Sequence, residues 1–133
     1  MSVGRVLFVL VAMFFAHTYA DFCSQGIMAS MKQKKWWKKQ EDYTEWNSKD
    51  YTMALVNHSL QWSFCIMLPL FVQDKWEISW TMFLVFFANV FFHYLIDNYK
   101  ANKYIFNLVQ DQFLHLIQIL WTFAMWMIDK VIV

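Results

Sequence analysis

Residues 76–99 read WEISWTMFLVFFANVFFHYLIDNY. From Met82 to Phe92 the only polar residue is Asn89. A helix needs about 20 predominantly apolar residues to cross the hydrocarbon core of a bilayer. The stretch is therefore predicted to form a membrane-spanning helix, and it ends with His93 and Asp97, two polar residues that lie four positions apart.

The composition extends this prediction to the whole chain. Hydrophobic residues make up 59% of the 133 residues and charged residues 16%, whereas soluble domains usually carry about a quarter charged residues. Two glycines and one proline suit long helices, and an aromatic content of 21% fits a lipid-facing surface with interfacial belts. The net charge of +1 gives no reason to expect a nucleic-acid partner.

Three further segments resemble the first. We expect helices at about 3–25, 51–72, 76–99 and 104–129 within a single transmembrane domain, residues 1–133. The first segment resembles a cleavable signal peptide, but the spacing of His17 and Asp21 favours a helix that is retained. Because the later connections are short, successive helices should be antiparallel neighbours. The expected fold is all-α, an integral membrane four-helix bundle with up-down topology.

The connection at about 28–50 has a different composition. Residues 32–39 read KQKKWWKK, and Glu41, Asp42 and Glu45 follow. We interpret this stretch as a basic, aromatic interfacial segment, with tryptophans at the level of the lipid headgroups and lysines on anionic lipid. A solvated loop is one alternative, and a nucleic-acid patch is a weaker one.

The placement of lysines predicts the orientation. Six lysines lie in the first connection, and Lys100 and Lys103 lie in the third, whereas the opposite face has only Arg5, Lys75 and Lys130. Cytoplasmic loops of membrane proteins carry an excess of Lys and Arg. We therefore expect the first and third connections to face the cytoplasm and both termini to lie on the non-cytoplasmic side.

Histidines and carboxylates recur at helical spacing inside the predicted spans. Three His–carboxylate pairs are each four residues apart, which places both members on one helix face: His17 and Asp21, His93 and Asp97, and Asp111 and His115. A fourth histidine, His58, lies near the start of its segment. In an up-down bundle all of these residues fall on the cytoplasmic side, so each helix contributes one histidine to a common layer. Ionisable residues within spans are costly and commonly functional.

Two interpretations of this layer compete. In the first it binds one or two divalent metal ions, Zn²⁺, Mn²⁺ or Fe²⁺, for which imidazole and carboxylate are ordinary ligands. The candidate metal ligands are His17, Asp21, His58, His93, Asp97, Asp111 and His115. In the second it is a hydrogen-bonded network that holds the helices together or relays protons. Passage of protons or metal ions along the layer is a third, weaker interpretation.

The metal interpretation gives roles to single residues. Asp97 and Asp111 are the candidate catalytic residues, one of them a general base towards metal-bound water. His58 has no carboxylate four residues away and could instead orient a ligand by a hydrogen bond. Three polar residues are expected to orient ligands or to bind a substrate phosphate or carboxylate, unless they only contact water at a helix end: Gln25, Lys100 and Gln112.

These residues carry a resemblance to a known family. Small phage and bacterial membrane proteins, catalogued only as a domain of unknown function, resemble this chain in four ordered motifs: His17-x3-Asp21-x3-Gln25, then His58, then His93-x3-Asp97-x2-Lys100, then Asp111-Gln112-x2-His115. The resemblance covers nearly the whole chain and implies a membrane protein of phage or prophage type, without implying a reaction. A protein of this type would lie in the bacterial inner (cytoplasmic) membrane. A looser similarity, in residue types alone, is to membrane-bound metal-dependent hydrolases.

Two functions are compatible with the sequence. The first is a membrane-embedded, metal-dependent hydrolase that acts on a lipid-linked or membrane-proximal substrate. The second is a non-enzymatic phage-type membrane protein that acts through a membrane protein partner, in exclusion of other phages or in assembly, with the layer as a structural network. Membrane lipid is the expected partner in both cases, together with a membrane protein or a second copy of the chain, and no nucleic acid is expected.

Overall fold

The computed structural model describes residues 2–132, and the regular structure within this range is helical, with no strand. The elements are α1 (Val3–Thr18), the π-helix η1 (Tyr19–Cys23), α2 (Met28–Met31), α3 (Lys34–Trp37), α4 (Asp50–Gln73), α5 (Trp80–Ala101) and α6 (Leu108–Ile132). The predicted all-α class is therefore confirmed for the described residues.

Capping residues explain why two helices begin later than the apolar pattern predicts. α5 begins at residue 80 instead of 76, because the Ser79 hydroxyl accepts a hydrogen bond of 3.1 Å from the backbone N–H of Met82. α6 begins at residue 108 instead of 104, because Asn107 and Gln110 bond reciprocally through side chain and backbone, at 2.9 and 3.1 Å. Both arrangements satisfy backbone donors of a first helical turn, and hydrophobic periodicity does not reveal them.

The first helix changes its winding before it ends. After Thr18 the chain continues as the π-helix Tyr19–Cys23, and Gly26 then adopts a left-handed backbone conformation with φ of 49°. The helix predicted at 3–25 therefore ends before Gln25. A π-helix is rare and occurs frequently at functional sites, and this one carries Asp21.

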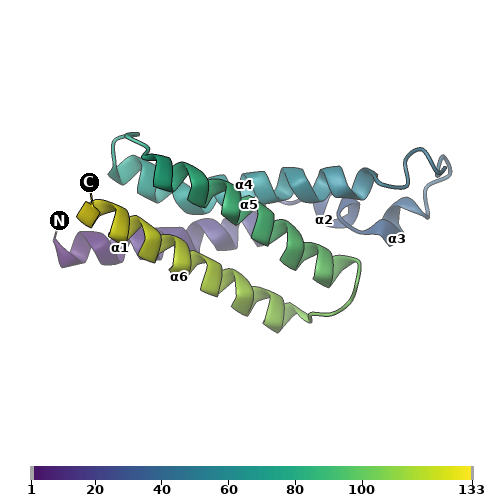
Figure 1. The fold of residues 1–133 in the computed structure, drawn as a ribbon. Helices are drawn as coiled ribbons and strands as arrows, with labels where there is room; N and C mark the ends of the chain where they lie inside the picture. The colour runs from purple at the N-terminus through teal and green to yellow at the C-terminus, as the bar shows by residue number, and fades with distance from the viewer. Residues whose placement is uncertain (1, 133) are drawn as a thin grey trace.

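α4 lies at the centre of the packing. It packs against both α1 and α5, and α6 packs against α5 and α1. Figure 1 shows both termini at one end of the molecule, beside the connection between α4 and α5, while α2, α3 and the α5–α6 connection lie towards the other end. The end of α1, the start of α4, the end of α5 and the start of α6 therefore occupy the same half of the molecule.

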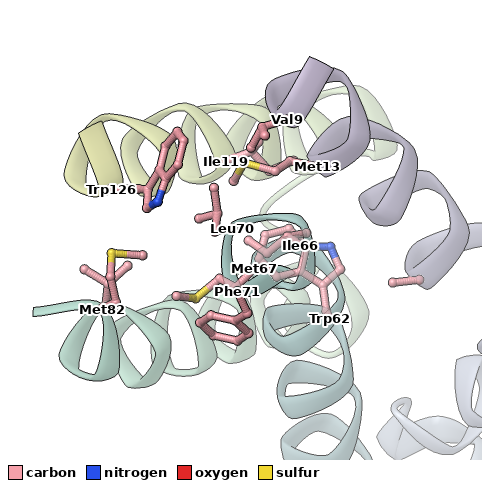
Figure 2. Packing of buried hydrophobic residues seen from close by; sticks show 12 residues of the cluster. Val9, Met13, Trp62, Ile66, Met67, Leu70, Phe71, Met82, Ile119 and Trp126 are labelled. Carbon is pink, nitrogen blue, oxygen red and sulfur yellow. The ribbon is translucent and has the colours of Figure 1, made fainter. Parts of the chain in front are cut away.

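An apolar core fills the half of the molecule that lies nearest the termini (Figure 2). Its buried side chains come from α1, α4, α5 and α6, and they include Val9, Met13, Trp62, Ile66, Met67, Leu70, Phe71, Met82, Val85, Ile119 and Trp126. Trp62 is the member of this cluster nearest the start of α4. In Figure 2 its indole nitrogen points towards α1, and polar residues begin beyond it.

The outer surface is apolar as well. Large hydrophobic side chains are exposed on every long helix, among them Phe8, Phe64, Phe87 and Phe113. Within the described residues, three helical segments are long and apolar enough to cross a membrane: Val3–Cys23, Asp50–Gln73 and Trp80–Ala101. These segments indicate membrane association. α6, which the sequence predicts as a fourth span, is not among them in the part of the chain that the structure describes.

Replacing Leu70 by alanine should destabilise the protein, because this side chain is fully buried in the core. Such truncations lower the free energy of unfolding by about 2–5 kcal/mol. The matched control is Leu84→Ala, at a leucine of α5 that is 67% exposed. Unfolding of the detergent-solubilised protein, followed by circular dichroism, should show a clearly lower free energy of unfolding for Leu70→Ala and little change for Leu84→Ala. Equal losses of stability in the two variants would contradict this core.

Candidate metal centre

The structure brings the predicted histidines and carboxylates together beside the core. They come from α1, η1, α4, α5 and α6: His17, Asp21, His58, His93, Asp97, Asp111 and His115. The four histidines, Asp97 and Asp111 are buried, and the Asp21 side chain is only 5% exposed. Each of the four long helices thus contributes one histidine to a single buried cluster.

Two groups within this cluster have a geometry that could hold a metal ion. One group is Asp21, His58 and His93, and the other is His93, Asp97 and His115. In each group the potential ligand atoms lie within 4.8 Å of one another, and His93 belongs to both. Bonds from zinc to nitrogen or oxygen ligands are about 2.0–2.2 Å long, so modest side-chain movements suffice to bring three donors onto one ion.

The Nε2 atoms of three histidines converge on two carboxylates. His58 Nε2 lies 3.3 Å from Asp21 Oδ1 and 3.5 Å from Asp97 Oδ2. His115 Nε2 lies 3.4 Å from Asp97 Oδ1, and His93 Nε2 lies 3.7 Å from Asp97 Oδ2. Most of these separations exceed those of good hydrogen bonds. They leave room for an ion between the donor atoms.

Several atoms of the cluster have no hydrogen-bond partner. Within residues 2–132, neither ring nitrogen of His93 or His115 has one, and Asp21 Oδ1 and Asp111 Oδ1 also lack one. Buried polar groups are almost always hydrogen-bonded, and an unsatisfied one costs about 1–3 kcal/mol. Imidazole nitrogens and carboxylate oxygens are metal ligands, so these unsatisfied atoms fit a divalent cation.

His17 has a different environment, which Trp62 determines. The indole N–H of Trp62 donates a 2.9 Å hydrogen bond to His17 Nδ1, so the ring proton lies on Nε2, which donates to Gln112 Oε1 at 3.1 Å. Gln112 Nε2 then donates to Asp21 Oδ2 and Asp111 Oδ2, at 3.1 and 3.0 Å. Both nitrogens of His17 are thus occupied. His17 thus contacts the carboxylates through Gln112 and belongs to neither of the two groups that could hold a metal ion. Its role as a metal ligand stays a prediction.

Two lysines pair with carboxylates of the cluster. Lys32 Nζ lies 2.6 Å from Asp97 Oδ2, and Lys100 Nζ lies 2.6 Å from Asp111 Oδ2. Lys32 is buried, although the sequence predicts that it lies on the lipid surface with its neighbours. The reason is that α2 packs against α4 and carries the following Lys32 into the cluster.

Asn102 holds the backbone at Lys32 and two residues after it. Its side-chain nitrogen donates to the backbone carbonyl of Lys32 at 3.0 Å, and its side-chain oxygen accepts from the backbone N–H of Lys34 at 2.6 Å. The end of α5 therefore holds the start of the basic segment by backbone contacts as well as by the Lys32–Asp97 pair.

The predicted orienting residues lie at the edge of the cluster. Gln25 Nε2 donates to the backbone carbonyl of Asp21 at 2.6 Å and lies 3.5 Å from His58 Nε2. Gln25, Lys100 and Gln112 all line a cavity of about 330 Å³, which also reaches Asp21 and Asp97. These three residues therefore line the cavity that lies beside the cluster.

Sequence reasoning missed two residues that shape the centre. Trp62 follows His58 by four residues, so the spacing that reveals the His–carboxylate pairs also marks it. Its ring stacks on that of His93, with centroids 4.2 Å apart and planes inclined by 22°. Lys32 gives no such signal, because it is one of six lysines in the connection, and only the packing of α2 distinguishes it.

A second buried polar network lies deeper along α5 and α6. Asn89 Oδ1 accepts hydrogen bonds from Gln118 Nε2 at 2.9 Å and from Thr122 Oγ1 at 3.0 Å. Beyond it, Leu70 and Trp126 fill the interior with apolar surface. This network joins the two helices, and the apolar core separates it from the end of the molecule that holds the termini.

Comparison with known proteins leaves the family of this chain open. No family model matches it, and neither a curated protein nor a solved structure is significantly similar to it. The resemblance to small phage and bacterial membrane proteins therefore stays a prediction, and the functional argument rests on the residues themselves.

Replacing Lys32 by methionine should destabilise the protein, because Asp97 would keep a buried charge without its ammonium partner. Removing one member of a buried ion pair costs about 3–5 kcal/mol, and we expect a loss of this order in the free energy of unfolding. Adding Asp97→Asn should recover part of the loss. Lys38→Met, at an exposed lysine of the same connection, is the control, and a loss as large in this control would refute the buried pair.

Replacing Trp62 by phenylalanine should release the ring proton of His17 from its fixed position on Nε2. The change removes a hydrogen bond worth about 1 kcal/mol and leaves Nδ1 free to carry the proton. Nitrogen NMR of the histidine-labelled protein should show the Nε2–H form in the native chain and a mixture in the variant. Trp126→Phe is the control, because Trp126 bonds to Asp74 at the other end of the molecule. An unchanged His17 signal in Trp62→Phe would exclude this arrangement.

Proposed function

We propose that this chain is an integral protein of the bacterial inner membrane, in which α1 with η1, α4, α5 and α6 form an up-down four-helix bundle. The exposed hydrophobic side chains on all four helices support this arrangement, as do the short connections after α4 and α5. α6 is less apolar because Asp111, His115 and Gln118 are buried inside. The lysine excess supports an orientation with the candidate metal centre near the cytoplasmic side and both termini on the other side.

The function that this cluster supports best is metal-dependent hydrolysis of a lipid-linked or membrane-proximal substrate. The observation that carries the proposal is the convergence of His58, His93 and His115 on Asp21 and Asp97, with buried nitrogens that lack hydrogen-bond partners within residues 2–132. Such nitrogen and oxygen donors suit Zn²⁺, Mn²⁺ or Fe²⁺. A divalent ion with an open position supplies Lewis acidity and a water nucleophile at neutral pH.

The two predicted catalytic carboxylates have different access to a substrate. Asp97 lines the 330 Å³ cavity, so its carboxylate is placed to accept a proton from an incoming water. Asp111 is fully buried and binds Lys100 and Gln112. In this proposal Asp21, His58 and His93 would hold the metal ion and Asp97 would act as the general base, while Asp111 positions Lys100 and Gln112 beside it.

One observation favours a second function. Asp97 and Asp111 already have cationic partners in Lys32 and Lys100, so the cluster can also serve as a structural network that ties the basic connection to the helices. This structural role would suffice for the polar layer of a non-enzymatic membrane protein. It would act through a membrane protein partner or a second copy, in exclusion or assembly, as the resemblance to phage-type proteins suggests.

Elemental analysis of the purified, detergent-solubilised protein tests the metal centre. We expect near-stoichiometric zinc, manganese or iron in the native protein, and loss of most of it after His93→Ala combined with His115→Ala. These histidines supply two of the three members of the second ligand group, and His93 also belongs to the first. Circular dichroism should confirm that the double variant stays helical.

The matched control is Asn57→Ala combined with Gln61→Ala, which removes two exposed polar side chains from α4. This control should keep the metal. A native protein that is well folded and takes up no metal from added Zn²⁺, Mn²⁺ or Fe²⁺ would refute the hydrolase and leave the structural network as the function of the layer.

A further inference from the structure

The cavity beside the candidate metal centre is lined by charged residues of both signs. It lies between η1, α2, α5 and α6, and the cluster carboxylates Asp21 and Asp97 form its inner end. Its remaining charged lining consists of ammonium groups, those of Lys32, Lys35 and Lys100. At about 330 Å³ it lies at the small end of the range for ligand sites, which suits a headgroup and not a whole lipid.

Two of the three lysines, Lys32 and Lys35, lie three residues apart in the connection before α4, whereas Lys100 lies near the end of α5. Lys32 and Lys100 already bind Asp97 and Asp111 at 2.6 Å. Lys35 is exposed, and its Nζ lies 5.7 Å from the ring centroid of Tyr104, another residue of the cavity wall. Lys32 and Lys100 therefore lie next to the carboxylates, and Lys35 lies at the exposed side of the cavity.

The formal charges of this region balance only without a metal ion. Three carboxylates, Asp21, Asp97 and Asp111, face three ammonium groups, Lys32, Lys35 and Lys100. The carboxylates and ammonium groups cancel, so a bound divalent cation leaves an excess of two positive charges. Uncompensated charge beside buried ionised groups such as Asp97 and Asp111 is unfavourable, so the metal-bound form has an electrostatic preference for a ligand that carries two negative charges.

We propose that the cavity binds a phosphate group with two negative charges, such as that of a phosphate monoester, between Lys32, Lys35, Lys100 and the metal ion. The inference rests on the proposed metal centre and names the substrate class of that site. Ammonium groups bind phosphate oxygens through charge-assisted hydrogen bonds. A neutral ester or amide would leave the excess positive charge unmatched.

The phosphate can belong to a membrane lipid or to a soluble compound, and the surroundings of the cavity admit both. Phe22, which is 58% exposed, forms part of the wall and belongs to the segment Val3–Cys23, one of those apolar enough to cross a membrane. Lys35 lies in the basic segment that we expect at the level of the headgroups. A phosphorylated lipid headgroup therefore has a path into the cavity from the membrane surface.

The experiment starts from the full chain in detergent, supplied with Mn²⁺ and assayed for bound manganese. Inorganic phosphate is then titrated and its ³¹P NMR signal recorded, because Mn²⁺ broadens the signal of a phosphorus atom that binds beside it. We expect saturable broadening with the manganese-bound protein, and binding at least about tenfold weaker in its absence, since two positive charges are then missing.

Lys35→Ala is the decisive variant, because Lys35 forms no ion pair with a carboxylate among the described residues and its loss should not unfold the chain. We expect phosphate binding about fivefold weaker, which is the upper range for an exposed charge pair. The matched control is Lys34→Ala, at the neighbouring lysine whose Nζ lies 6.0 Å from the ring centroid of Tyr51 instead. Lys100→Gln with Lys103→Gln as its control provides a second pair.

The outcomes separate the two proposals. A protein that binds no manganese overturns both the metal centre and the phosphate site. Bound manganese without phosphate binding, or equal weakening by Lys35→Ala and Lys34→Ala, overturns the phosphate site alone. Competition from nanodiscs that contain phosphatidic acid, and not from nanodiscs of phosphatidylglycerol, identifies a lipid phosphate. Phosphate binding without such competition identifies a soluble phosphate.

Discussion

Buried charge is the constraint on which the rest of this structure depends. A carboxylate removed from water is very unfavourable unless partners surround it. Asp97 meets this requirement mainly with Lys32 from the connection, at 2.6 Å, while His58 from α4 and His115 from α6 lie farther away, at 3.5 and 3.4 Å. Apolar packing is non-directional and alone would let these helices slide or rotate against one another. The ion pairs and hydrogen bonds of the cluster specify which helices are neighbours and at what height they meet.

The sequence predicts the long helices and the composition of the polar layer, because both depend on periodicity along single helices. Four-residue spacing identifies Asp97 with His93 and Asp111 with His115, and the structure places all of them in one cluster. Helix boundaries are harder to predict from the sequence, because they depend on single capping contacts. Ser79 and Asn107 delay the starts of α5 and α6, and the apolar pattern extends across both positions without a break.

Roles within the cluster are beyond sequence reasoning where they depend on contacts between different elements. His17 has the same spacing to a carboxylate as the other histidines, yet the N–H of Trp62 occupies the nitrogen that would otherwise face Asp21. Lys32 has five lysine neighbours of similar composition in the same connection. Residue spacing predicts which side chains share a helix face. The hydrogen-bond donors and acceptors of the neighbouring helices determine which of their atoms remain free for a metal ion.

The anchoring of the basic connection at its start has a consequence for how this chain can diversify. Asn102 and Asp97 hold residues 32 and 34 against the end of α5, so the linker from Cys23 to Lys32 has a fixed span and a left-handed Gly26 within it. From Lys38 to Lys49 the chain has no comparable contact with α5 among the described residues. Insertions and deletions should therefore accumulate in the second part of the connection, while the first part keeps a constant length.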